Sequence, residues 1–267
     1  MKHKKTILTL IALGLFHIAA PILAQTYTVV RAQGKVTLQS NKKTLRHADK
    51  FKAAPLQFSD IRDFLVVLDE KEEAFVLYPE ATLKKHQTKH LPPTGARPGL
   101  ILSDLQLRTF LDDNDSLLLL NGQYSLLLGR DAFPMDDQHF FYLQYVWRGD
   151  TINKKLSFRQ DTLLIQAAEL YKVDGNPIDP MEVSERHYLF YLNTRTQKSV
   201  AYPPSGNPLY ILRPDDEAIQ KEMNMILQPH QDKPFHLRLQ AATTYLREIY
   251  GTPGDAEVEH LIKTLQK

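Results

Sequence analysis

Cysteine is absent from the 267 residues of this chain. Its absence excludes disulfide bonds, thiolate metal sites and a cysteine nucleophile. It also excludes a lipid anchor attached to a cysteine near the N-terminus. Hydrophobic burial and hydrogen bonding must therefore hold the fold together.

The chain also has little net charge. It contains 33 Lys and Arg against 31 Asp and Glu. Residues 1–24 hold three of the lysines and no acid, so residues 25–267 carry a formal charge of −1, from 30 basic and 31 acidic side chains. A near-neutral chain has no electrostatic reason to bind nucleic acid or an anionic membrane, and we expect neither as a partner.

Long hydrophobic runs are missing beyond the N-terminus. There, Lys2, Lys4 and Lys5 precede an apolar run over residues 7–20, and the small residue Ala24 follows. This order is typical of a secretory signal peptide, so we predict a signal over residues 1–24 with cleavage after Ala24. No later run approaches the roughly 20 apolar residues that cross a bilayer. We therefore expect no transmembrane anchor after cleavage, and a product in the periplasm or outside the cell.

Residues 25–80 favour a small β domain. Segments rich in β-branched and aromatic residues cover residues 27–30, 35–38, 64–68 and 74–78. A turn signal at residues 32–34 and a charged loop at residues 69–73 separate them into two pairs, as in hairpins. Short strands at this spacing predict a small barrel or sandwich.

A sparse motif in this region resembles FecR-type periplasmic β domains. The residues are Val29, then Gly34-Lys35-Val36, a leucine before a charged stretch at residues 45–49, and a strand-turn-strand that ends in Tyr78-Pro79. The resemblance covers residues 27–80 and implies a small sheet of the kind found in envelope signalling proteins of Gram-negative bacteria. The inner-membrane helix of that family has no counterpart here, which argues against transmembrane signalling.

The rest of the chain divides into a linker, a second β domain and a helical tail. Residues 81–99 are first basic and then rich in Pro and Gly, as in a linker. Residues 100–212 favour an antiparallel β domain, in which Asn121-Gly122 predicts a type I′ hairpin between leucine-rich segments buried between layers. Residues 213–267 show the apolar spacing of three amphipathic helices, over about residues 214–229, 234–250 and 255–265. The predicted fold is therefore mainly β, of the α+β type. A small N-terminal barrel or sandwich precedes a larger antiparallel domain, on which the C-terminal amphipathic helices pack.

The aromatic segment at residues 139–147 is the strongest candidate for a binding surface. Alternation places Phe141, Leu143, Tyr145 and Trp147 on one face of a strand, with Phe140, Tyr142, Gln144 and Val146 on the other. If one face is core, the other still carries aromatic rings, and an exposed aromatic face suits sugar or peptide binding. We predict a binding role for these residues: Phe140, Tyr142, Tyr145 and Trp147. The alternative is that helices or a second sheet cover both faces.

Two acidic or arginine-containing motifs favour a structural interpretation. Arg148-Gly149-Asp150 matches an adhesion tripeptide, but Gly and Asp are expected in a hairpin turn. Residues 112–115 cluster oxygen ligands suited to calcium, yet Leu117 lies where an EF-hand needs Gly. We interpret residues 112–115 as a polar loop that caps the leucine-rich hairpin.

Two further motifs, of histidine and serine, also fail as sites. His86 and His90 have the spacing of zinc ligands on a helix, but neighbouring lysines would repel a cation and the segment lacks apolar residues. Ser205 has only one of the two glycines that flank a nucleophile elbow. We expect no metal and no cofactor.

These observations favour an exported, non-enzymatic envelope protein, which binds a protein partner or a cell-surface polymer as a binding or assembly module. One alternative is a hydrolase that acts on glycans or peptides through carboxylates brought together by the fold. Carboxylates available for this role are Asp131, Asp136, Asp137, Glu169 and Glu182. Another is a regulatory subunit whose C-terminal helices dock to a partner.

Overall fold

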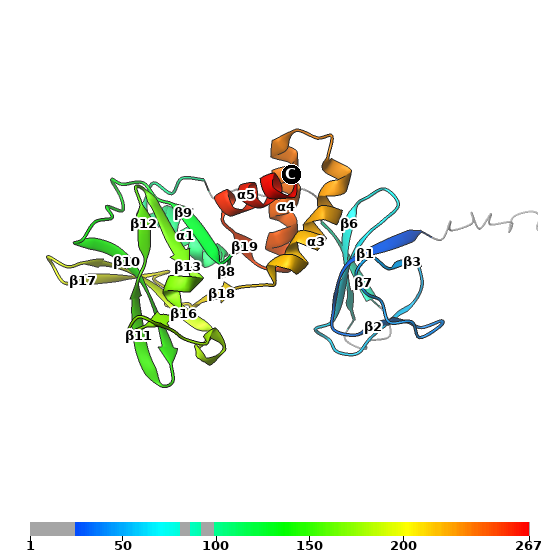
Figure 1. Cartoon of the computed structure of the whole chain (residues 1–267), viewed down its shortest axis with the longest axis horizontal. Helices are drawn as coiled ribbons and strands as arrows, with labels where there is room; N and C mark the ends of the chain where they lie inside the picture. The colour runs from blue at the N-terminus through cyan, green and yellow to red at the C-terminus, as the bar shows by residue number, and fades with distance from the viewer. Residues whose placement is uncertain (1–24, 81–85, 92–98, 267) are drawn as a thin grey trace, which may run out of the picture. The chain divides into compact units, whose positions relative to one another are not determined.

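The computed structural model describes residues 25–80, 86–91 and 99–266 (Figure 1). The signal predicted over residues 1–24 lies outside these described residues, as do residues 81–85 and 92–98 of the predicted linker. The chain divides into two compact units between Lys89 and His90. The described part is mainly β, as the sequence predicts, with several antiparallel sheets, C-terminal helices and no closed barrel.

The first unit consists of two sheets around one core. A five-stranded sheet has the order β3-β1-β5-β6-β7, and a two-stranded sheet pairs β2 with β4. The strands are β1 (Thr26–Gln33), β2 (Val36–Leu38), β3 (Lys50–Lys52), β4 (Leu56–Phe58), β5 (Phe64–Leu68), β6 (Ala74–Pro79) and β7 (His86–His90). Apolar side chains from both sheets fill the space between them, including Val29, Val36, Leu56, Leu65 and Leu77. The sequence left a barrel and a sandwich as alternatives for this unit. The two sheets do not close into a barrel.

The first expected hairpin of this unit does not form. β1 pairs with β3 and β5, whereas β2 pairs with β4 in the other sheet. Gly34, with φ of 73°, turns the chain between the sheets at a point where a Cβ would lie 1.8 Å from Asp63 Oδ1. Asp63 is buried and accepts hydrogen bonds from the backbone of Ser59 and Asp60, both at 2.9 Å, so it cannot easily move aside. The chain does turn at Gly34, but residues 32 and 33 of the expected turn belong to β1, and the turn is a corner between two sheets.

Strand β7 lies within the segment predicted as a linker. It pairs with β6 and forms one edge of the five-stranded sheet. The side chains of residues 87–90 are exposed, so the strand buries no apolar residue and shows no period-two hydrophobic pattern. A polar edge strand of this kind is hard to distinguish from a linker in sequence.

The second unit places two sheets on either side of a large core. One sheet has the order β11-β10-β16-β18-β8-β19, with β17 also paired to β16, and the other has the order β12-β13-β9. The strands of the first are β8 (Ser116–Leu118), β10 (His139–Trp147), β11 (Asp150–Lys155), β16 (Arg186–Asn193), β17 (Lys198–Tyr202), β18 (Leu209–Leu212) and β19 (Thr252–Pro253). Those of the second are β9 (Gln123–Leu127), β12 (Ser157–Arg159) and β13 (Thr162–Gln166). Smaller elements are α2 (Ala167–Leu170), β14 (Lys172–Val173), β15 (Asn176–Pro177), and the 3-10 helices η1 (Pro180–Glu182) and η2 (Gln228–His230).

The Asn121-Gly122 turn forms as expected, but its two arms enter different sheets. Asn121 and Gly122 have φ values of 50° and 70°, and Leu120 and Gln123 exchange both backbone hydrogen bonds at 3.0 Å. Beyond this single bridge, β9 pairs with β13, whereas β8 pairs in parallel with β18 and β19. Residues 117–120 are buried, as predicted, because β8 lies inside the sheet. The expected burial of the other arm on both faces is wrong, since Leu127 of β9 is 41% exposed.

Helix α1 (Asp104–Asp113) was not predicted, although the sequence contains a signal for it. Ser103 Oγ accepts a hydrogen bond from Gln106 N at 3.2 Å, and Gln106 Oε1 accepts one from Leu102 N at 2.6 Å. This is a capping-box arrangement, and Leu107 and Leu111 lie buried one turn apart. Asp112 therefore belongs to the last turn of a helix, which corrects the polar-loop interpretation of residues 112–115.

The three predicted C-terminal helices are present as α3 (Asp216–Leu227), α4 (Phe235–Ile249) and α5 (Asp255–Leu265). Glu222 of α3 is buried and accepts hydrogen bonds from Tyr245 Oη at 2.8 Å and Tyr250 Oη at 2.6 Å, which ties α3 to α4. Helix α5 packs against β9 through Glu257, so the helices are part of the folded unit. None of the helices in the described ranges combines the length and apolarity needed to cross a membrane.

Gly254, which precedes α5, allows the close approach of this helix to β9. A Cβ at this position would lie 2.1 Å from Glu257 Oε2 and 3.1 Å from the backbone N and O of Ser125. We predict that Gly254→Ala lowers the free energy of unfolding by about 1–3 kcal/mol, because the buried carboxylate and the strand must shift. Chemical denaturation measures this change. Gly99→Ala is the matched control, since nothing lies within 4 Å of a Cβ there, and equal effects at the two glycines would contradict the prediction.

His187 makes the stability of the second unit depend on pH. Burial lowers the pKa of its imidazole below the usual 6.5, and nearby Arg213 acts in the same direction. The unfolded chain therefore takes up this proton near pH 6.5 while the folded chain does not, so the free energy of unfolding should fall as the pH drops below about 6.5. The slope from this one group should reach at most about 1.4 kcal/mol per pH unit. Denaturation between pH 7.5 and 5.5 measures it. His187→Gln should flatten the slope, and exposed His260→Gln should not; an unchanged slope in His187→Gln would refute the assignment.

Candidate functional site

The outer face of β10 and β16 carries a continuous set of partly exposed aromatic and aliphatic side chains. The antiparallel register pairs Tyr142 with Phe190, Gln144 with Tyr188, and Phe140 with Leu192. Alternate residues of the same strands, such as Phe141 and Leu189, point into the core. We name the outer set the aromatic face; its members are Phe140, Tyr142, Val146, Tyr188, Phe190 and Leu192.

The rings of the aromatic face are held in fixed positions. Tyr142 and Phe190 stack with ring centroids 5.0 Å apart and planes 10° from parallel, and Tyr142 Oη lies 3.0 Å from Ser199 Oγ on β17. Lys155 Nζ lies 4.3 Å from the centre of the Phe140 ring. A stacked pair and a cation over a ring both restrict side-chain motion, so this surface is ordered before any partner binds.

The structure separates the four residues for which a binding role is predicted. Phe140 and Tyr142 belong to the aromatic face. Tyr145 is only 1% exposed, its hydroxyl donates to Leu170 O at 2.7 Å, and burial raises its pKa to about 12. Trp147 is half-buried at the end of the opposite face and donates its indole N–H to Glu182 Oε2 at 3.3 Å. Only the first two are therefore placed to contact a partner as one surface.

The Arg148-Gly149-Asp150 tripeptide forms the turn between β10 and β11. Arg148 donates two hydrogen bonds to Glu182, at 2.8 and 3.1 Å, and its guanidinium lies 4.9 Å from the Trp147 ring. Asp150 pairs with Trp147 in the register of the two strands. The arginine is thus engaged by its own chain.

The structure places the histidine candidates in a strand and the serine candidate beside a carboxylate. His86 and His90 lie in strand β7, where residues four apart are separated by about 13 Å along the chain. Across the described ranges, His, Asp and Glu side chains form no group of three that could hold a metal ion. Ser205 Oγ donates to Asp112 Oδ1 at 3.1 Å, so its neighbour is a carboxylate and it forms no pair with a histidine base.

Two of the carboxylates suggested for hydrolysis, Asp136 and Glu182, are poor general acids. The backbone N–H groups of Gln138 and His139 hold the pKa of Asp136 below its usual range. Arg148 lowers the pKa of Glu182 in the same way. A glycosidase acid needs the opposite shift, because it must stay protonated at neutral pH.

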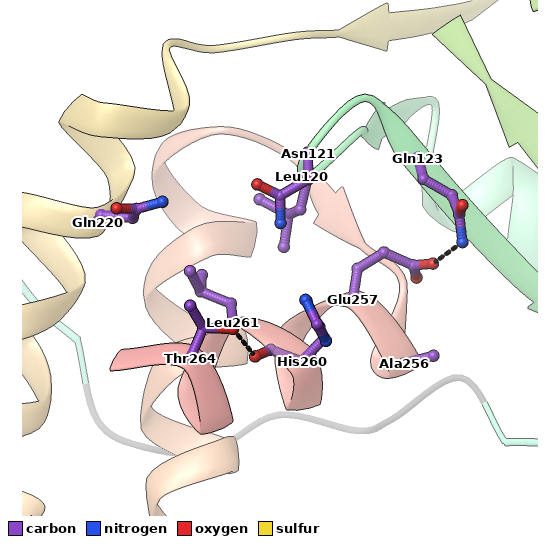
Figure 2. A pocket seen from close by; sticks show the side chains of 9 residues that line it. All are labelled: Leu120, Asn121, Gln123, Gln220, Ala256, Glu257, His260, Leu261 and Thr264. Atoms are coloured by element: carbon purple, nitrogen blue, oxygen red, sulfur yellow. Dashed lines mark hydrogen bonds between the residues drawn. The ribbon is translucent and has the colours of Figure 1, made fainter. Parts of the chain in front are cut away.

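A pocket that sequence reasoning missed lies between the Asn121-Gly122 turn, α3 and α5 (Figure 2). Its volume is about 490 Å³. Nine residues line it: Leu120, Asn121, Gln123, Gln220, Ala256, Glu257, His260, Leu261 and Thr264. They come from three separate segments, residues 120–123, 220 and 256–264, so no local motif in the sequence predicts them.

Glu257, one of the lining residues, has a carboxylate that is held in place by hydrogen bonds. It is 7% exposed, and its oxygens accept hydrogen bonds from Ser125 N and Gln123 Nε2, both at 3.2 Å, and from Ser125 Oγ. Burial, aided by the charge of Glu257, raises the pKa of the neighbouring Tyr124 hydroxyl. Because both oxygens are engaged, Glu257 serves to attach α5 to β9 and is not free to act as a base.

Comparison of the chain with models of protein families, with characterised proteins and with solved structures gave no match. The resemblance of residues 27–80 to FecR-type domains therefore stays a prediction.

Proposed function

We propose that this chain is an exported, non-enzymatic protein of the cell envelope that binds a protein partner through the aromatic face. The stacked Tyr142–Phe190 pair on the outer side of the sheet carries the proposal. Rigid aromatic rings at the centre of a surface, with polar groups around them, are typical of protein interfaces.

The arrangement of the rings favours a protein over a sugar polymer. A sugar ring stacks on an open aromatic face, but Phe190 covers one side of Tyr142 and Lys155 lies over Phe140. Ring edges and aliphatic groups remain accessible, and Val146 is 43% exposed. A protein partner can contact these groups, while Gln144 and Asn153 beside them supply polar contacts.

The partner can be trapped by a photo-crosslinking residue, p-benzoylphenylalanine, placed at Val146 of the full chain in living cells. We expect one dominant protein adduct from this position. Met181 is the control position, because it is 87% exposed and does not belong to the aromatic face. Equal adducts from both positions, or a glycan adduct from Val146, would contradict a protein-binding aromatic face.

Affinity for the trapped partner should depend on the stacked pair. We predict that Tyr142→Ala weakens binding about tenfold or more, because aromatic residues at interface centres contribute most of the binding energy. Titration with the purified partner measures the change. Tyr78→Ala, which removes a half-buried tyrosine from β6 in the other unit, should leave affinity unchanged. Equal affinity of both variants and the parent would refute the proposal, provided that thermal unfolding shows Tyr142→Ala to be folded.

Export is tested separately by the N-terminus of the protein made in cells. The composition of residues 1–24 predicts removal of this segment, so mass spectrometry of the protein from the envelope or the medium should find Gln25 as the first residue. Lys2, Lys4 and Lys5 replaced together by Glu should reduce processing, because the positive start orients the signal. An intact N-terminus in the parent protein would contradict export by this route.

A further inference from the structure

The pocket between the Asn121-Gly122 turn, α3 and α5 has the form of a small-molecule site (Figure 2). Its volume of about 490 Å³ lies within the range of ligand pockets, roughly 300–1,000 Å³. Leu120 and Leu261, both nearly fully buried, supply its apolar side. Polar side chains from three separate elements surround this apolar surface.

Several of these polar side chains have no hydrogen-bond partner in the part of the chain that the structure describes. The side chains of Asn121, Gln220 and His260 make no hydrogen bond to any residue in the described ranges. Thr264 donates its hydroxyl to His260 O at 2.9 Å, which leaves its oxygen free to accept. Two carboxamides, an imidazole and a hydroxyl oxygen are thus available to a ligand as both donors and acceptors.

The lining indicates that the ligand is uncharged. None of the nine lining residues is Lys or Arg, so no cation is present to bind a phosphate or a carboxylate. Glu257, the single acid among them, already accepts three hydrogen bonds from Ser125 and Gln123, so it is the least available of the polar groups to a ligand. A nucleobase would need an aromatic ring to stack on, and His260 is the nearest equivalent among the nine.

We propose that this pocket binds a neutral saccharide. Each sugar hydroxyl both donates and accepts hydrogen bonds, which matches the carboxamides of Asn121 and Gln220. The C–H groups of a sugar ring can lie against Leu120 and Leu261. This site is separate from the aromatic face and does not depend on the protein partner proposed above.

The walls of the pocket are linked to one another before a ligand binds. Asn121 N donates to Asp216 Oδ1 at 3.0 Å, which joins the turn to α3. Glu257 joins α5 to β9 immediately after the same turn. Fixed walls reduce the conformational entropy that the protein loses when a ligand binds. This matters for a sugar, because its weak contacts cannot offset a large loss of entropy.

Saturation-transfer NMR with the full chain tests this proposal. The probes are glucose, galactose, N-acetylglucosamine and their β-1,4-linked disaccharides, each at 10 mM, with the uncharged blocked tripeptide acetyl-Ala-Ala-Ala-amide as the competing class. We expect transfer to at least one sugar and none to the peptide. Gln220→Ala and His260→Ala should each weaken that binding about fivefold, since each removes a hydrogen-bonding group.

Gln240→Ala is the matched control, because Gln240 is a partly buried glutamine on α4 that does not line the pocket. It should leave sugar binding unchanged. Absence of transfer to every sugar, transfer to the peptide alone, or equal affinity of the parent and Gln220→Ala would overturn the proposal. Because the test changes no residue of the aromatic face, its failure and the failure of the proposed protein binding can be told apart.

Discussion

Strand β8 imposes the constraint on which the second unit depends. Its leucines are buried on both faces, so its backbone amides and carbonyls cannot reach water and must be paired on both edges. A buried unpaired group costs about 1–3 kcal/mol. Strand β18 satisfies one edge and β19 the other, both in parallel. Strand β19 lies between α4 and α5 in sequence. Its pairing with β8, more than 130 residues earlier, therefore holds the C-terminal helices beside the sheet.

Glu257 fixes the position of α5 relative to β9. A buried carboxylate must be fully hydrogen-bonded, and Ser125 and Gln123 of β9 provide the donors. Gly254 leaves room for this contact, since a Cβ would clash with the carboxylate itself. Glu257 thus fixes α5 against β9 beside the Asn121-Gly122 turn. The polar pocket is the space left between that turn, α3 and α5. Its walls are rigid because these contacts hold them in place.

Local patterns in the sequence led to correct predictions for features that depend on the residues of a single element. The alternation of β10 correctly separated Phe141 and Tyr145 from Phe140 and Tyr142, because successive side chains of a strand point to opposite faces. The same reasoning overlooked α1, although Ser103 and Gln106 form a capping box. It also treated β7 as a linker, because an edge strand without apolar residues lacks a hydrophobic period.

By itself the sequence determined the mainly β class of the fold, the turn at Asn121-Gly122 and the three C-terminal helices, because the signals for these features lie within a few residues of one another. Only the tertiary structure decided that the two arms of that turn enter different sheets and that Tyr145 is buried. It also brought Asn121, Gln220 and His260 to one pocket. Strand pairing and the contacts between helices and sheets join distant segments, and their partners are selected by the packing of the whole unit, which no local pattern encodes.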